Sequence, residues 1–184
     1  MTRWRDSRFI LAVVKLALAL IFLALAGCAT VPPTRQVAKP GPLPVALDRD
    51  FAFKKVKQFL FEPVLRPGLI GAALDPSIAF ERAYLSYGAI TALDQRQRFG
   101  NYYTLFWRSK RRANVTVRLE YRQENLHAFV QAREISYVNV RGPVETRFAI
   151  IGDDYFDDGR VIAWRASLIV EGRVVAVKRS YLWD

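Results

Sequence analysis

The chain has 184 residues, of which 28 are basic and 17 are acidic, so it carries a formal net charge of +11 at neutral pH. This length fits one ordinary domain with a short extension, and 52% hydrophobic residues allow a packed core. One cysteine excludes a disulfide within the chain, and one histidine leaves too few ligands for a usual zinc site.

The first 27 residues predict an export signal. Arg3, Arg5 and Arg8 form a basic start, and an apolar stretch follows from Phe9 to Ala26, interrupted once by Lys15. The uninterrupted part is shorter than the about 20 residues that a membrane-spanning helix needs. An uncleaved anchor over the same stretch is the alternative, with the lysine side chain reaching toward the interface.

The apolar stretch ends in the tetrapeptide Leu25-Ala26-Gly27-Cys28. This tetrapeptide resembles the lipobox of bacterial lipoproteins. The resemblance implies cleavage between Gly27 and Cys28 and acylation of Cys28, and two or more acyl chains hold a protein stably at a membrane. In many Gram-negative lipoproteins an aspartate after the cysteine causes retention at the inner membrane. Ala29 stands at that position here, so the resemblance implies the outer membrane, facing the periplasm.

Export changes how the net charge is interpreted. The segment 1–27 holds four basic residues and one acidic residue, so its removal lowers the net charge from +11 to +8. A basic balance often indicates nucleic acid as a partner, but an exported protein does not meet it. We therefore expect no nucleic acid as a partner. We also expect no cofactor. The charge fits anionic lipid headgroups, lipopolysaccharide phosphates or acidic cell-wall polymers, or it serves only solubility.

The segment 28–47 predicts a lipidated cysteine followed by a proline-rich tether. Its prolines are Pro32, Pro33, Pro40, Pro42 and Pro44. Proline removes a backbone donor and fixes φ, so neither a helix nor a central strand is expected. A polyproline-like segment of this length reaches on the order of 50 Å at about 3.1 Å per residue. We expect a spacer without structure of its own, followed by one domain over 48–184.

The first part of that domain, 48–78, is predicted to be irregular. Within 48–62 the pattern leaves helix and strand open, because Val56, Phe59 and Leu60 follow helical spacing while the preceding phenylalanines alternate. A basic amphipathic helix on a membrane surface is the functional alternative to an element packed on the domain.

From about residue 79 onward the pattern indicates strands. The clearest covers 113–122, where apolar and polar residues alternate strictly. The others are predicted over 83–93, where helix stays an alternative, and over 101–108, 129–138, 144–151, 161–170 and 173–183. Ser109–Arg112 is expected to be a charged hairpin loop, and Glu171–Gly172 a tight turn. Six or seven successive strands predict an all-β fold, an antiparallel β-sandwich of the immunoglobulin or fibronectin kind.

One short segment concentrates carboxylates. It contains Asp153, Asp154, Asp157 and Asp158. These oxygens are weak candidates for holding a hard cation, and a turn between two strands is the favoured interpretation. The same carboxylates in a cleft beside Glu120 or Glu134 would instead suggest a hydrolase. His127 is interpreted as a solvated loop residue rather than a general base.

A possible binding surface combines aromatic side chains with cations of the expected loop. It consists of Tyr102, Trp107, Arg111 and Arg112. Core packing is the alternative for the aromatic residues. The sequence thus predicts a non-enzymatic binding or structural module, held at the cell envelope by lipid on Cys28, whose partner is an envelope protein, a lipid or a cell-wall component. An envelope hydrolase that uses carboxylates is the alternative.

Overall fold

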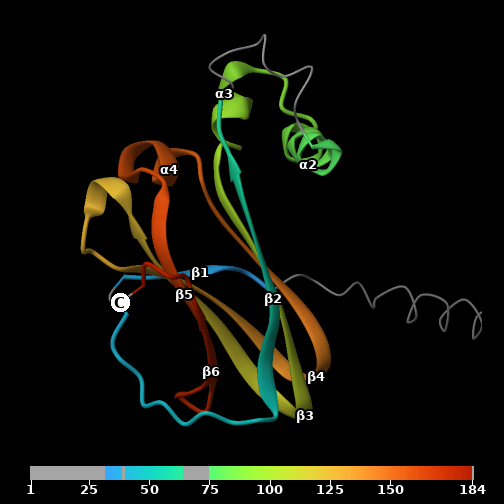
Figure 1. Cartoon of the computed structure of the whole chain (residues 1–184), viewed down its shortest axis with the longest axis vertical. Helices are drawn as coiled ribbons and strands as arrows, with labels where there is room; N and C mark the ends of the chain where they lie inside the picture. Colours follow the sequence, from blue (N-terminus) through green and yellow to red (C-terminus); the bar gives the residue numbers. More distant parts are fainter. Residues whose placement is uncertain (1–31, 39, 64–74, 184) are drawn as a thin grey trace, which may run out of the picture. The chain divides into compact units, whose positions relative to one another are not determined.

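Two long antiparallel strands form the centre of the computed structural model, which describes residues 32–38, 40–63 and 75–183 (Figure 1). They are β3 (Gly100–Gln123) and β4 (Gln131–Ile151). The pairing runs from Gly100 opposite Ile151 to Tyr121 opposite Gln131. Pro33–Asp184 forms one compact unit. The predicted cleavage and lipidation site lies outside the described residues.

Four shorter strands complete the sheet within the described residues. β2 (Phe51–Phe61) pairs with the first half of β3, and β5 (Val161–Val170) pairs with the second half along the same edge. β6 (Arg173–Arg179) follows β5 through the predicted turn at Glu171–Gly172, and β1 (Arg35–Val37) borders β4. All these pairs are antiparallel, and the strands belong to one open sheet.

The long strand pair bends at a bulge near its middle. Ser109 lies opposite Gly142 and Ala113 opposite Val140, so three residues of β3 face only Arg141 of β4. A bulge bends the bulged strand and strengthens the local twist. The prediction of a hairpin loop at 109–112 is therefore wrong, because these residues belong to β3.

The predicted separate strands on each side of this bend are likewise continuous. Residues 101–108 and 113–122 belong to one strand of 24 residues, and 129–138 and 144–151 belong to one strand of 21 residues. The prediction of a mainly antiparallel β fold is confirmed. A sandwich of two sheets is not confirmed, because the strands that the structure describes share one sheet.

The inner face of the bent sheet carries the hydrophobic core. Its largest fully buried side chains are Trp107, Tyr121, Phe148, Leu105 and Leu119. Each contributes about 1.5–3 kcal/mol relative to an exposed side chain. They come from both halves of β3 and from β4, so the core fixes the bend between the two halves.

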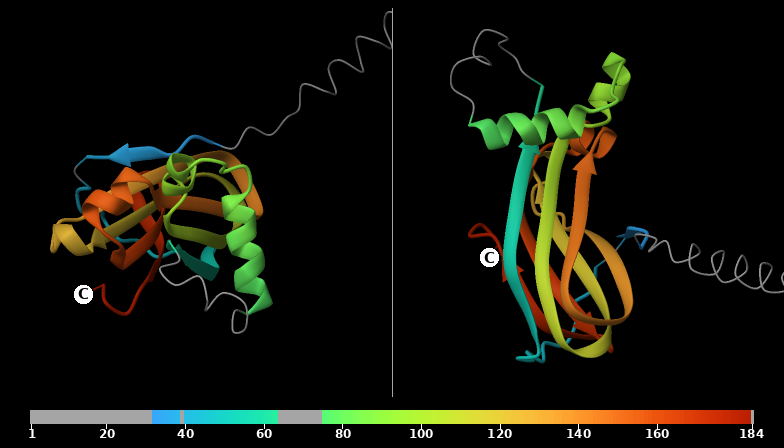
Figure 2. Two further views of the ribbon diagram at one scale, coloured as in Figure 1. Left: turned by 90° about the horizontal axis from the view of Figure 1, so that it is seen from above. Right: turned by 90° about the vertical axis from the view of Figure 1, so that its right-hand side faces the viewer.

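Two helices lie between β2 and β3, where the sequence predicts a strand over 83–93. They are α2 (Pro76–Ser86) and α3 (Ala92–Arg96). The strand prediction is wrong. The right-hand view of Figure 2 shows α2 across the end of the strands, at the opposite end from the bend.

Local capping explains why these residues form helices. The Asp75 carboxylate accepts a hydrogen bond from the Ser77 backbone N–H, and a proline occupies the first turn of α2. Thr91 and Asp94 form a reciprocal capping box at the start of α3. Gly88 follows the end of α2 with φ of +80°.

Short helical segments also replace two expected turns. α4 (Asp153–Asp158) connects β4 to β5 where a simple turn was expected. The 3₁₀ segment Glu124–Leu126 connects β3 to β4. His127 follows it in an exposed position with φ of +52°. The last hairpin is confirmed, although β6 ends at Arg179 and a buried Trp183 closes the chain against the domain.

The proline-rich segment lies on the sheet rather than extending as a spacer. β1 pairs Arg35 with Glu134 of β4. The backbone N–H groups of Ala46 and Asp48 donate 2.9 Å hydrogen bonds to the carbonyls of Val174 and Val175. Edge positions tolerate prolines, because their missing donors face outward. The part of the predicted tether from residue 33 on therefore belongs to the compact unit.

Candidate functional site

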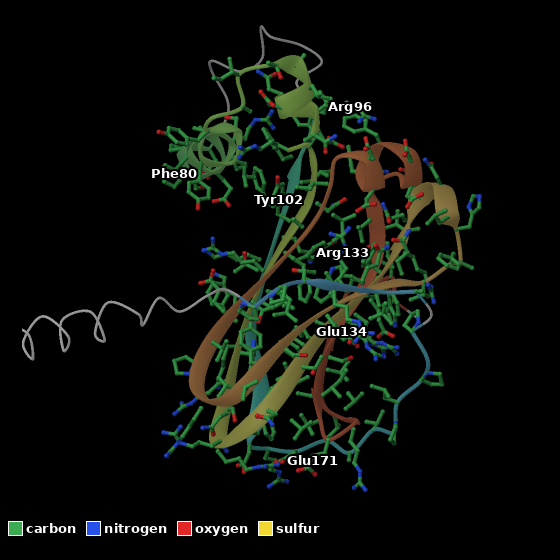
Figure 3. All side chains as sticks on the ribbon, turned by 180° about the vertical axis from the view of Figure 1, so that it is seen from behind. Phe80, Arg96, Tyr102, Arg133, Glu134 and Glu171 are labelled. Atoms are coloured by element: carbon green, nitrogen blue, oxygen red, sulfur yellow. The ribbon has the colours of Figure 1, made fainter. Side chains whose placement is uncertain are left out.

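A groove of about 1220 Å³ lies between α2 and the first half of the sheet. Tyr103, Leu105 and Trp107 of β3 point into the core, so the alternating residues between them lie on the opposite face. The groove opens on that outer face. Figure 3 shows Phe80 of α2 and Tyr102 of β3 in this part of the molecule.

The floor of the groove is a partly exposed aromatic strip. Tyr102, Thr104 and Phe106 of β3 line it and are half-buried. Phe59 of β2 lies opposite Tyr102, and Lys57 lies opposite Thr104. The Tyr102 hydroxyl donates a 2.6 Å hydrogen bond to the carbonyl of the loop that precedes β3, which leaves the ring to the groove.

The roof of the groove is one side of α2, which also carries Ser77 and Glu81. Ile78, Phe80 and Tyr84 line it. Phe80 remains 70% exposed and Tyr84 59% exposed, and no residue of α2 is buried. Large apolar side chains held in this way indicate a surface for another molecule, because their burial on contact is favourable.

Charged side chains stand at the sheet side of the groove. The Lys57 ammonium lies 5.6 Å from the centre of the Phe106 ring. The Arg147 guanidinium pairs with Glu145, and this hydrogen bond raises the pKa of Arg147, with a smaller contribution from the Tyr84 hydroxyl. The Tyr84–Arg147 interaction connects α2 to β4. The groove therefore offers aromatic surface beside the Lys57 ammonium and the Arg147–Glu145 pair.

Arg133 closes the inner end of the groove. Its guanidinium donates to the Ala149 carbonyl and to the carboxylate of Asp154 on α4. Beside it, Tyr121 donates a 3.0 Å hydrogen bond to Gln131, which donates to Asp158. The acidic segment thus binds side chains of the sheet and holds α4 over the end of the core.

The candidate metal ligands do not form a cation site. Asp153 pairs with Arg96, Asp154 with Arg133, and Asp158 accepts from Gln131. Within the ranges that the structure describes, no three His, Cys, Asp or Glu side chains form a group that could hold a metal ion. The arrangement that would suggest a hydrolase is also not formed among these residues. Glu120 pairs with Arg165 and Glu134 with Arg118, and none of these residues lines the groove.

The predicted binding surface is divided by the fold. Trp107 is 1% exposed and belongs to the core, so its prediction as a surface residue is wrong. Tyr102 lies in the groove, whereas Arg111 and Arg112 lie at the bulge, at the far end of the sheet from α2 (Figure 1). Phe80 and Tyr84 were missed, because the region was assigned to a strand. The helix-capping signal before Pro76 could have found them.

The chain has no match among protein-family models, and no significant match to it was found among curated proteins or solved structures. In the part of the chain that the structure describes, no helix has the length and apolar character needed to span a bilayer.

Proposed function

We propose that this protein is a lipid-anchored protein of the bacterial cell envelope that binds a ligand without transforming it, and that the α2 groove holds this ligand. The observation that carries the proposal is the aromatic roof of α2 facing an aromatic floor on β2 and β3. Ligand pockets are commonly apolar hollows of about 300–1,000 Å³ with a few polar groups, and this groove is of that order.

The lining favours an amphiphile with a long apolar body and a small anionic group. Phe59, Phe80 and Phe106 offer rings without hydrogen-bonding atoms, which suits an acyl chain. Lys57 stands at the sheet side, where a carboxylate or phosphate would find a charge-assisted donor, and Arg147 stands beside it in a pair with Glu145. Glu81 of α2 also lines the groove, so the anionic group is expected on the sheet side rather than against the helix. Such molecules are components of the membrane to which Cys28 would attach the protein.

The proposed location follows from the sequence. The lipobox-like tetrapeptide supports acylation of Cys28, and Ala29 supports the outer membrane, facing the periplasm. A Cys28→Ala variant should lose label from a metabolically supplied fatty acid and should leave the membrane fraction. Retention of both would contradict the anchor while leaving the groove proposal open to its own test.

The ligand proposal is tested with a fluorescent long-chain fatty acid. The Phe80→Ala, Tyr84→Ala double variant removes the exposed roof, and we expect the dissociation constant to rise by about tenfold or more. Both side chains are exposed, so the change costs little stability. Tyr181→Ala is the matched control, because Tyr181 is 95% exposed and outside the groove. Equal affinity of the groove and control variants would contradict the proposal.

A further inference from the structure

A cluster of exposed cations occupies the bend of the sheet, and we name it the basic tip. Its members are Arg108, Lys110, Arg111, Arg112 and Arg141, all exposed. The register places them together, since Lys110 to Arg112 face Arg141 across the bulge and Arg108 precedes them. The bend of β3 and β4 lies at the end of the sheet away from α2 (Figure 1).

The fold holds these cations in place and neutralises only part of their charge, since Lys110 and Arg111 pair with Asp48 and Asp50. The Lys110 backbone N–H donates 2.9 Å to the Asp50 carbonyl, and Arg141 Nε donates 3.1 Å to the Lys110 carbonyl. Arg111 lies over the Phe51 ring at 4.9 Å and pairs with Asp48 and Asp50.

Two carboxylates thus face five cations. Arg108 and Arg112 take part in no ion pair among the described residues. Like charges on neighbouring residues repel one another, so the gathering of these cations does not stabilise the fold. A partner with several anionic groups would relieve this repulsion.

We propose that the basic tip docks on the anionic phospholipid headgroups of the membrane that holds the protein. The proposal rests on the proposed anchor at Cys28 and adds a second contact that the groove does not use. Arginine forms forked hydrogen bonds with phosphate, and a basic segment near an anionic surface gains about fivefold in partitioning per cation.

The position of β1 favours the membrane as the partner of the basic tip. Six residues lie between Cys28 and Arg35, and an extended chain of these seven steps spans at most about 25 Å. Arg35 lies opposite Glu134, and seven residues along β4 from there lead to Arg141, a distance of about 23 Å. A domain held this close brings the tip within reach of headgroups.

The test uses the processed protein, purified from membranes and reconstituted in vesicles. Cys28 would be acylated, so a Val138→Cys variant offers a thiol for a fluorescent label beside the tip, where Val138 is 81% exposed. A Gln95→Cys variant labels α3 at the other end. Headgroup-spin-labelled lipid then quenches labels that approach the surface. We expect stronger quenching at residue 138 than at residue 95 in vesicles with phosphatidylglycerol, and a marked decrease in neutral vesicles or high salt.

Charge variants decide whether the tip causes the approach. The Arg108→Gln, Arg112→Gln double variant should lose most of the quenching at residue 138, whereas Lys178→Gln removes a charge elsewhere and should not. Equal quenching at both labels, or no effect of the double variant, would overturn the docking. Binding to purified cell-wall polymer without quenching by lipid would also overturn it. A protein that does not float with vesicles at all overturns the anchor, and the docking with it.

Discussion

The indole nitrogen of Trp107 donates a 2.9 Å hydrogen bond to the hydroxyl of Thr146, joining β3 to β4 inside the core. Both residues are 1% exposed. The Tyr137 hydroxyl lies 2.8 Å from the same threonine oxygen, and its ring packs edge-on against Trp107 at 5.6 Å. Tyr137 comes from the other side of the bend in β4, so this group of three side chains connects the two halves of the sheet.

Removing the shared hydroxyl should weaken the bend. Thr146→Val keeps the size of the side chain but leaves the Trp107 donor buried without its partner. We expect the free energy of unfolding to fall by about 1–3 kcal/mol, measured by urea denaturation. Thr104→Val on the half-buried outer face is the control and should change it by less than about 0.5 kcal/mol. Similar values for the two variants would show that the buried hydroxyl is unimportant.

Gly100 marks the start of β3, where the chain passes very close to β4. Its φ is +144°, and an added Cβ would lie 2.2 Å from the Ile150 carbonyl oxygen and 2.8 Å from the Ile151 Cα. Gly100→Ala should therefore cost more than about 2 kcal/mol, because backbone must shift to relieve the clash. Gly88→Ala also places alanine at positive φ but meets nothing within 4 Å. Gly88→Ala should lower the free energy of unfolding by about 1 kcal/mol, measured by thermal or urea unfolding. An equal loss for Gly88→Ala and Gly100→Ala would contradict the clash at Gly100.

Alkaline pH should destabilise the protein through its buried tyrosines. Burial raises the pKa of Tyr103, and the neighbouring Tyr121 raises it further. The unfolded chain therefore loses the phenolic proton near pH 10 while the folded chain keeps it. Stability is fully present below pH 10 and falls as the pH rises above it, since the folded state then binds more protons. Urea unfolding should show this fall, and Tyr103→Phe should reduce its slope while Tyr181→Phe, at a 95% exposed site, should not. Identical slopes would contradict the assignment.

The strand content and the last hairpin could be predicted because their signals are local. Alternation over 113–122 depends only on which side chains face the core, and the structure places Val115, Val117 and Leu119 there. Glu171 and Gly172 both take positive φ, at +50° and +73°, as a two-residue hairpin turn requires.

The bend could not be predicted, because its signal is shared between distant segments. Ser109–Arg112 and residues 139–143 each interrupt a strand pattern, and each alone resembles a loop. Their pairing across the bulge turns two apparent loops into one kink in a long strand pair. Pairing over such sequence separations follows from the whole sheet rather than from local preference. For the same reason the sequence analysis placed Trp107 on a surface, whereas the structure buries it in the core.

The groove was missed for a different reason. Residue propensity over 83–93 favours a strand. The caps at Asp75 and Thr91 satisfy backbone N–H groups at the starts of α2 and α3, and this stabilisation outweighs the strand propensity. The apolar residues of α2 then have no core to enter. The sequence therefore predicted Tyr102 on the floor of the groove but not Phe80 and Tyr84 on its roof.

The central claim is that the α2 groove is a ligand site, and filling its floor tests this most directly. Thr104→Trp places a large ring in the groove, whereas Thr116→Trp places the same ring on the outer face of the other half of the sheet. Titration with the fluorescent long-chain fatty acid should show saturable binding to the unchanged protein and to Thr116→Trp, and a loss of about tenfold or more in affinity for Thr104→Trp. Equal binding by all three, with folding confirmed by circular dichroism, would contradict the account.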